Sequence, residues 1–152
     1  MQIAEIDFCG PNDLSALVAI EKACFDDPWE ARVIERDLNG QGDALYLKAE
    51  FKRDVVAYAV ISRGDDICHL MNLAVMPEYR RMGIAQQLML AVQEVADDWG
   101  NRSIRLEVRA SNHDARHFYS SLGFAYNSRL KGYYASGEDA LVLTAKLPLK
   151  IS

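Results

Sequence analysis

Glu107 and Tyr119 are the two residues that stand where they could move protons. Residues 102–109 alternate between apolar and polar types, which predicts a strand with Glu107 near its end, on the face opposite the apolar side chains. Tyr119 lies two turns into the next predicted helix, for which Asn112 is a good N-cap. A carboxylate and a phenol presented from successive elements can serve as general base and general acid.

A purely structural interpretation of these residues is also open. Glu107 could pair with Arg105 or Arg109 in solvent, and Tyr119 could pack in the core beside Phe118. Taken singly, a glutamate or a tyrosine fits this interpretation better, because functional residues are a small minority of any chain.

A second candidate site is the junction at residues 80–85 (Arg-Arg-Met-Gly-Ile-Ala), between a predicted strand and a predicted helix. A helix N-terminus offers unpaired N–H groups and a partial positive charge. Gly83 and the small Ala85 would let a phosphate approach the backbone, and Arg80 and Arg81 add charge. The junction therefore suits a diphosphate, although it matches neither a Walker loop nor a Rossmann fingerprint. The six residues alone also fit an exposed basic loop.

The remaining pattern predicts the elements that must position these sites, in the order β-α-α-β-β-β-α-β-α-β-β. We expect an α/β fold, a single domain over residues 1–152 with a mixed central sheet flanked by helices, antiparallel early and with a βαβ crossover late. The tail, Leu147–Ser152, is expected to fray. Predicted strands cover 2–8, 44–51, 55–62, 67–76, 102–109 and two segments within 124–148, and predicted helices cover 11–25, 30–38, 84–99 and 112–122.

The chain's length and charge exclude several classes of protein. It has 152 residues, with 17 Lys and Arg against 22 Asp and Glu, a net charge of −5. A nucleic-acid binder or a polybasic membrane-surface protein needs an excess of basic residues. No apolar run is long enough to span a membrane, and the acidic, alternating N-terminus does not resemble a secretory signal. We therefore expect a cytoplasmic protein with no nucleic-acid or membrane partner.

The cysteines and histidines indicate no metal site. Cys9, Cys24 and Cys68 are odd in number, and their spacings match no zinc or redox motif, which favours reduced thiols. His113 and His117 stand four apart on one predicted helix face, but a metal site needs at least a third ligand. We expect no metal cofactor.

The motifs together resemble a known family. Asn-Leu-Ala-Val-Met-Pro at 72–77, the basic junction at 80–85 and the stretch from Glu107 to Phe124 occur in this order and spacing in the GCN5-related N-acetyltransferase (GNAT) superfamily. The junction corresponds to that superfamily's Q/R-x-x-G-x-G/A signature, which binds the pyrophosphate of acetyl-CoA. The resemblance covers most of the chain and is strongest over residues 67–126, and it implies the GNAT fold with acetyl-CoA as cosubstrate.

A finer resemblance is to the RimI type, the ribosomal-protein alanine N-acetyltransferases. It is carried by Leu-Glu-Val-Arg-Ala-Ser-Asn at 106–112, by Pro28-Trp29, and by Tyr133-Tyr134 followed by Glu-Asp-Ala at 138–140. It implies that Glu107 is the proton acceptor and Tyr119 the proton donor. The contacts to acetyl-CoA expected from the junction and the resemblance are Leu73, Ala74, Val75, Arg80, Arg81, Met82, Gly83, Ile84, Ala85, Gln86 and Asn112.

Three aromatic residues, Trp29, Tyr133 and Tyr134, are candidates for the peptide side of the site. Packing in the core is the equal alternative, since large aromatics are common there. The family often has a proline after the tyrosine pair and a basic residue before Glu-Asp. Here these are Ala135 and Gly137, which leaves the substrate preference of this loop open.

The expected activity is acetyl transfer from acetyl-CoA to the N-terminal residue, alanine, of a ribosomal protein. A terminal α-amine has a pKa of about 7.7–8.0 against about 10.4 for lysine, so a modest base deprotonates it more readily. Glu107 would suit this task if its site raised its pKa, and backbone N–H groups near residues 73–75 would hold the developing oxyanion. The acidic chain should attract a basic peptide.

Two other functions remain open from the sequence. The cofactor motifs are shared with enzymes that acetylate lysine side chains or small amines. A non-catalytic acyl-CoA-binding domain would also carry the junction, although the presence of both Glu107 and Tyr119 speaks against it. The sequence does not indicate an oligomeric state.

Overall fold

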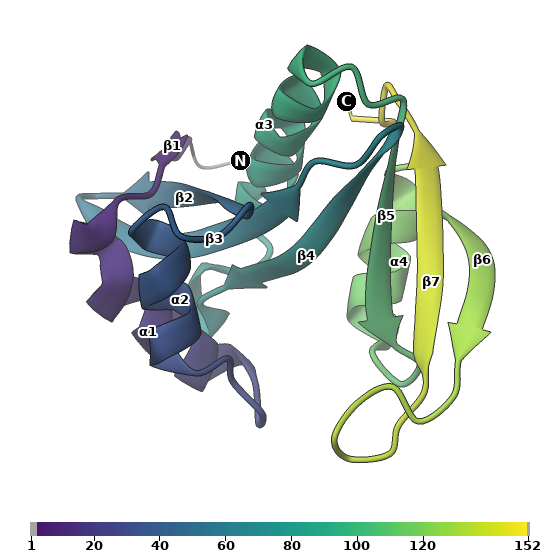
Figure 1. Ribbon diagram of the computed structural model, residues 1–152, viewed down its shortest axis with the longest axis horizontal. Helices are drawn as coiled ribbons and strands as arrows, with labels where there is room; N and C mark the ends of the chain where they lie inside the picture. Colours follow the sequence, from purple (N-terminus) through teal and green to yellow (C-terminus); the bar gives the residue numbers. More distant parts are fainter. Residues whose placement is uncertain (1–2, 152) are drawn as a thin grey trace. The chain divides into compact units, whose positions relative to one another are not determined.

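The computed structural model describes residues 3–151 and contains the predicted elements in the predicted order (Figure 1). Residue 2 of the predicted first strand and Ser152 lie outside the described residues. The seven strands are hydrogen-bonded in the order β1-β2-β3-β4-β5-β7-β6, so the predicted α/β class with a mixed sheet is confirmed. The elements are β1 (Glu5–Phe8), a 3₁₀ turn (Pro11–Asp13), α1 (Leu14–Cys24), α2 (Ala31–Leu38), β2 (Leu45–Phe51), β3 (Asp54–Ser62), β4 (Ile67–Val75), a second 3₁₀ turn (Pro77–Tyr79), α3 (Ile84–Asp98), β5 (Ser103–Arg109), α4 (His113–Ser121), β6 (Ala125–Leu130) and β7 (Ala140–Lys146).

The strand directions also follow the prediction. β1, β2 and β3 pair antiparallel, as do β5, β7 and β6. β4 and β5 pair parallel over four positions, from Ile67 opposite Ser103 to Leu70 opposite Leu106, and α3 forms the crossover between them. Parallel neighbours need such a connection because a tight turn cannot join them.

The chain forms two compact units, of which the first comprises residues 3–62 and 72–92. Within it, α1 and α2 pack on one face of β2 and β3 (Figure 1). Residues 56–61 of β3 are buried at every position, as the unbroken apolar run predicts for a strand covered on both faces. The core beneath α1 and α2 consists of Leu17, Ile20, Ile34, Tyr46, Tyr58, Val60 and Ala74.

The second unit comprises residues 63–71 and 93–151, and in it α4 lies against the sheet formed by β5, β7 and β6 (Figure 1). The predicted alternation in β5 is confirmed, since Ile104, Leu106 and Val108 are buried. The Asn112 side chain accepts the Ala115 N–H at 3.1 Å and so caps α4, as predicted.

The prediction that the tail frays is wrong for residues 147–151. The Leu147 N–H donates to the carbonyl of Arg102 at 2.8 Å, and the Lys150 N–H donates to the carbonyl of Leu122 at 2.9 Å. Leu149 is buried, and its N–H donates to Gln93 Oε1 at 2.6 Å. This segment is held against the second unit by the burial of one apolar side chain and by backbone N–H groups that all have acceptors.

The described part of the chain contains neither a membrane-spanning helix nor a cluster of metal-binding side chains. None of its helices is long and apolar enough to cross a membrane. Between residues 3 and 151, no three histidine, cysteine, aspartate or glutamate side chains gather into a group that could hold a metal ion.

Candidate active site

Glu107 is the centre of a charged cluster in the second unit. Its Oε1 lies 2.6 Å from Nε2 of His69 on β4, and its Oε2 lies 3.4 Å from Nε of Arg105 on its own strand. The Glu107 side chain is 12% exposed and that of His69 26%. The parallel register sets His69 opposite Arg105, so Glu107 is its diagonal neighbour on the same face. Glu107 is therefore partly buried and paired, in contrast to the solvent-exposed ion pair considered from sequence.

The pKa of Glu107 differs from the expectation. Burial alone raises the pKa of this carboxyl, but the hydrogen bond and charge of His69, together with Arg105, lower it below its ordinary value of 4.5. The sequence-based condition that the site would raise this pKa is thus not met. Glu107 is therefore ionised throughout the neutral range, where its carboxylate can accept a proton.

Tyr119 lies on α4, and its buried ring is part of an aromatic cluster. Its ring meets Phe118 and Phe124 edge to face, with centroids 5.2 Å and 5.4 Å away. Burial raises the pKa of the phenol, and the nearby phenol of Tyr134 raises it further. The phenol is therefore protonated at neutral pH, and its raised pKa makes it a weaker acid than an ordinary tyrosine. The alternative considered from the sequence, packing of Tyr119 beside Phe118, is present in the structure, and these contacts hold the ring in place.

Tyr133 and Tyr134 lie in the loop between β6 and β7. Their rings pack edge to face at 5.1 Å, and Tyr133 is 51% exposed. Burial raises the pKa of Tyr134 to about 12 and also raises that of Tyr133, and in both cases the negative charge of Glu107 contributes. Glu107, the tyrosine pair and, through Tyr134, Tyr119 therefore lie within electrostatic reach of one another in the second unit.

The basic junction lies in the first unit. Arg81 and Gly83 both adopt the left-handed conformation, with φ of 62° and 82°, immediately before α3 begins at Ile84. Alternating backbone of this kind turns successive N–H groups toward one concave surface, where an anion can bind. The Arg80 Nε–H donates to the Val75 carbonyl at 2.9 Å, so this arginine also ties the junction to the end of β4.

Trp29 belongs to a buried polar network in the first unit that was not predicted from the sequence. The backbone N–H of Trp29 donates to Oε1 of Glu21 at 2.8 Å. The other carboxylate oxygen of Glu21, Oε2, accepts from the Tyr58 hydroxyl and from the Asn72 side-chain amide, both at 2.7 Å. Glu21 is 1% exposed. The Trp29 ring packs against the core, so the packing interpretation describes it within this unit.

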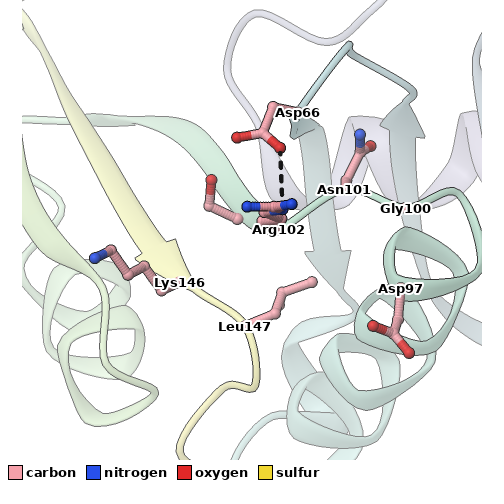
Figure 2. Close-up of a pocket in the computed structure, with 8 residues that line it drawn as sticks. Asp66, Asp97, Gly100, Asn101, Arg102, Lys146 and Leu147 are labelled. Atoms are coloured by element: carbon pink, nitrogen blue, oxygen red, sulfur yellow. Dashed lines mark ion pairs between the residues drawn. The ribbon is translucent and has the colours of Figure 1, made fainter.

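A pocket of about 550 Å³ lies elsewhere in the second unit (Figure 2). Two of its lining residues, Arg102 and Asp66, form an ion pair at 3.7 Å (Figure 2). Among the described residues, Asn101 Oδ1 is buried without a hydrogen-bond partner, while Nδ2 donates to the Gly64 carbonyl. The pocket reaches Ser103, four residues or about 13 Å along β5 from Glu107. It contains none of the predicted site residues and is lined by Asp66, Asp97, Gly100, Asn101, Arg102, Ser103, Lys146 and Leu147.

The comparison with known families shows the general class of this protein. The sequence model of the Acetyltransferase (GNAT) family matches residues 14–124, which is most of the chain and includes the junction, Glu107 and Tyr119. The chain belongs to the GNAT family of acetyltransferases. It is therefore an acetyltransferase, of a family that uses acetyl-CoA. The predicted fold and family are confirmed.

Several relatives in this family have names that specify the acceptor of the acetyl group. The [ribosomal protein bS18]-alanine N-acetyltransferase of Haemophilus ducreyi is 33% identical over 142 residues, covering 90% of this chain and 95% of the relative. An N-alpha-acetyltransferase of Saccharolobus solfataricus is 44% identical over 80 residues, covering 52% of this chain and 48% of the relative. The crystal structure of the ribosomal-protein-S18-alanine N-acetyltransferase from Escherichia coli superposes with a TM-score of 0.84 at 29% identity, covering 95% and 94% of the two chains.

The predicted site residues thus fall into two groups, one in each unit. Glu107, Tyr119, Asn112 and the tyrosine pair lie in the second unit, while residues 73–75, 80–86 and Trp29 lie in the first. The sequence did not single out His69 or connect it with Glu107. A polar residue inside the apolar 67–76 strand was the available signal.

Proposed function

We propose that this GNAT enzyme acetylates the N-terminal α-amine of a protein, with alanine as the first residue of its acceptor. The relatives named for this reaction support the proposal, because they match across nearly the whole chain at about 30% identity. The observation that carries it within this chain is the partly buried Glu107 carboxylate at 2.6 Å from His69.

Glu107 would accept the proton that leaves the attacking amine. Its lowered pKa keeps the carboxylate ionised at neutral pH, and the hydrogen bond with His69 holds it in place. The amine nitrogen forms a bond to the acetyl carbon as the carbon–sulfur bond breaks. Tyr119, which is protonated at neutral pH, would donate its proton toward the departing sulfur.

Acetyl-CoA, when bound, supplies the thioester. Arg81, Gly83 and the first N–H groups of α3 would hold its pyrophosphate, since their left-handed turns make a concave donor surface. The other residues assigned to it here are Leu73, Ala74, Val75, Arg80, Met82, Ile84, Ala85, Gln86 and Asn112.

The choice of an α-amine over a lysine follows from proton affinity. An α-amine is more than two pKa units less basic than a lysine ammonium, so a base of low pKa removes its proton at a smaller free-energy cost. The net charge of −5 favours an acceptor with a basic N-terminal segment, as a ribosomal protein has.

An acceptor panel tests the proposal. The enzyme is incubated with acetyl-CoA and basic peptides that begin with Ala, Ser, Gly or Met, each in free and N-terminally blocked form, and the mass gain is recorded. We expect acetylation of free peptides, fastest for Ala. Faster acetylation of blocked, lysine-containing peptides would indicate a lysine acetyltransferase. Binding of acetyl-CoA without transfer to any amine would indicate an acyl-CoA-binding domain.

A further inference from the structure

The loop between β6 and β7 carries Tyr133 and Tyr134 and is closed by Asp139 at its end. Asp139 Oδ1 accepts the Gly132 N–H at 2.9 Å, and Oδ2 accepts from Arg129 at 2.8 Å. These contacts join the two ends of the hairpin to each other. They shape the loop but do not attach it to the strand that holds Glu107.

A second set of contacts makes that attachment through Glu138. Its Oε2 accepts the Ser111 N–H at 2.8 Å, in the turn that precedes α4. Its Oε1 lies 3.3 Å from Nη1 of Arg109, the last residue of β5. The Ala110 N–H donates to the Asp139 carbonyl at 3.1 Å. One carboxylate therefore connects the loop to both the strand of Glu107 and the turn that leads to Tyr119.

Arg109 reaches the tyrosine pair directly. Its guanidinium lies 4.0 Å from the centroid of the Tyr134 ring, and Nη1 also donates to Ser136 Oγ at 3.2 Å. Tyr133 rests edge-on against the same Tyr134 ring. A guanidinium over an aromatic face is attracted by the ring's electron density, and its hydrogen bonds fix its plane. The position of Tyr134, and through it that of Tyr133, thus depends on Arg109.

Arg109 also stands in a fixed relation to Glu107. The two are separated by one residue in β5, so their side chains leave the same face of the strand. The Arg109 guanidinium is committed to Tyr134, Ser136 and Glu138, whereas the charge partners of Glu107 are His69 and Arg105. The guanidinium of Arg109 therefore contacts the β6–β7 loop and is not a partner of the Glu107 carboxylate.

We propose that Arg109 is a positioning residue that, together with Glu138, holds Tyr133 and Tyr134 beside Glu107 and so sets how tightly the first residues of the acceptor bind. The proposal rests on the proposed function, because it assigns these tyrosines to the acceptor side of the same site. It requires the planar guanidinium of arginine. Lysine would keep the charge but would lose both the flat stack and the forked hydrogen bonds.

Steady-state kinetics with four variants test the proposal. Arg109→Lys, Arg109→Met and Glu138→Gln are compared with Arg102→Met, a matched control that removes an exposed arginine paired to Asp66. We expect Arg109→Lys and Arg109→Met to raise KM for the acceptor peptide about five- to tenfold, the effect of losing a cation–π contact and its hydrogen bonds. Their kcat and their KM for acetyl-CoA should stay within about twofold of the unmodified enzyme, as should every constant of Arg102→Met.

Amide hydrogen exchange supplies a readout that needs no acceptor. In the Arg109 variants and in Glu138→Gln, the amides of Ser111, Tyr134 and Gly137 should exchange faster, because the contacts that protect the loop are weakened. Unchanged exchange at these amides would overturn the proposal, whatever the activity. An acceptor KM that Arg109→Lys leaves unchanged would also overturn it, since charge alone would then suffice. If the unmodified enzyme acetylates no peptide, the proposed function fails, while the exchange data still decide the role of Arg109.

Discussion

His69 Nε2 and Glu107 Oε1 lie 2.6 Å apart, although the two residues are 38 positions apart in the chain. The parallel pairing of β4 with β5 creates this contact, and it changes the chemistry of the carboxylate, because the hydrogen bond and charge of His69 oppose the effect of burial on its pKa. Glu107 is therefore an ionised carboxylate held by a hydrogen bond to an imidazole.

Replacing Glu107 with Gln should reduce kcat about 10²- to 10⁴-fold, the usual loss when a positioned base is removed. Gln keeps the shape of the side chain but cannot take a proton. Binding of acetyl-CoA, measured by calorimetry, should be preserved. Glu5→Gln, which alters an exposed glutamate on β1, is the matched control and should retain full activity. A normal kcat for Glu107→Gln would remove Glu107 from the mechanism.

Replacing His69 should raise the pKa of Glu107, which can be followed by the ¹³C NMR signal of its carboxyl carbon. His69→Phe removes both the hydrogen bond and the charge, so the effect of burial then weighs more, whereas His69→Gln keeps a hydrogen-bond donor and should give a smaller rise. The order Phe above Gln above the unmodified protein is the expected result. Equal pKa values in all three proteins would contradict the coupling.

The same pKa shift predicts how stability depends on pH. Because the folded-state pKa of Glu107 lies below its ordinary value of 4.5, its ionised form stabilises the fold above that value, and this contribution is lost as the pH falls through the folded-state pKa. Urea unfolding between pH 3 and 6 should therefore show a weaker acid-side loss of stability in Glu107→Gln. An identical pH dependence in the two proteins would contradict the lowered pKa.

Tyr119→Phe should separate packing from proton donation. The ring contacts to Phe118 and Phe124 persist, so the melting temperature should change little, while kcat should fall about 100-fold with loss of the hydroxyl. Tyr119→Ala should in addition lower the free energy of unfolding by about 3–5 kcal/mol, as for other large buried aromatics. A Phe variant with unchanged kcat would leave Tyr119 with packing alone.

Local patterns in the sequence predicted most of the fold correctly. Alternation identified β5, the unbroken apolar run identified β3 as a covered strand, and Asn112 was correctly assigned as a helix cap. Each of these features depends on residues close together in the chain. The fraying prediction for the tail failed because Leu149 is held by contacts to distant segments, including Gln93, which no local pattern reveals.

The site was less predictable for the same reason. Glu107 and Tyr119 are candidates from the strand and helix patterns and from a family resemblance, but their partners depend on strand register and loop packing. His69 meets Glu107 only once β4 pairs with β5, and Arg109 meets Tyr134 only once the β6–β7 loop folds back. Glu21 stood on an otherwise apolar helical stripe, and a charge at such a position was the one sequence signal of the buried network.

Glu21→Ala should destabilise the first unit, because three donors would lose their buried acceptor: the Tyr58 hydroxyl, the Asn72 amide and the Trp29 N–H. We expect a loss of about 3 kcal/mol or more in the free energy of unfolding measured in urea. Glu35→Ala, on the exposed face of α2, should cost less than about 0.5 kcal/mol. Equal effects of the two substitutions would mean that the network adds no stability.

The most direct test of the proposed reaction uses one basic peptide that has both an N-terminal alanine and an internal lysine. After incubation with acetyl-CoA at neutral pH, tandem mass spectrometry locates the acetyl group, with the unmodified enzyme and Glu107→Gln run in parallel. The proposed function predicts acetylation of the α-amine, leaving the lysine free, at a rate at least about 100-fold lower in Glu107→Gln. Acetyl groups on the lysine, or an α-amine acetylated equally fast by both proteins, would contradict it.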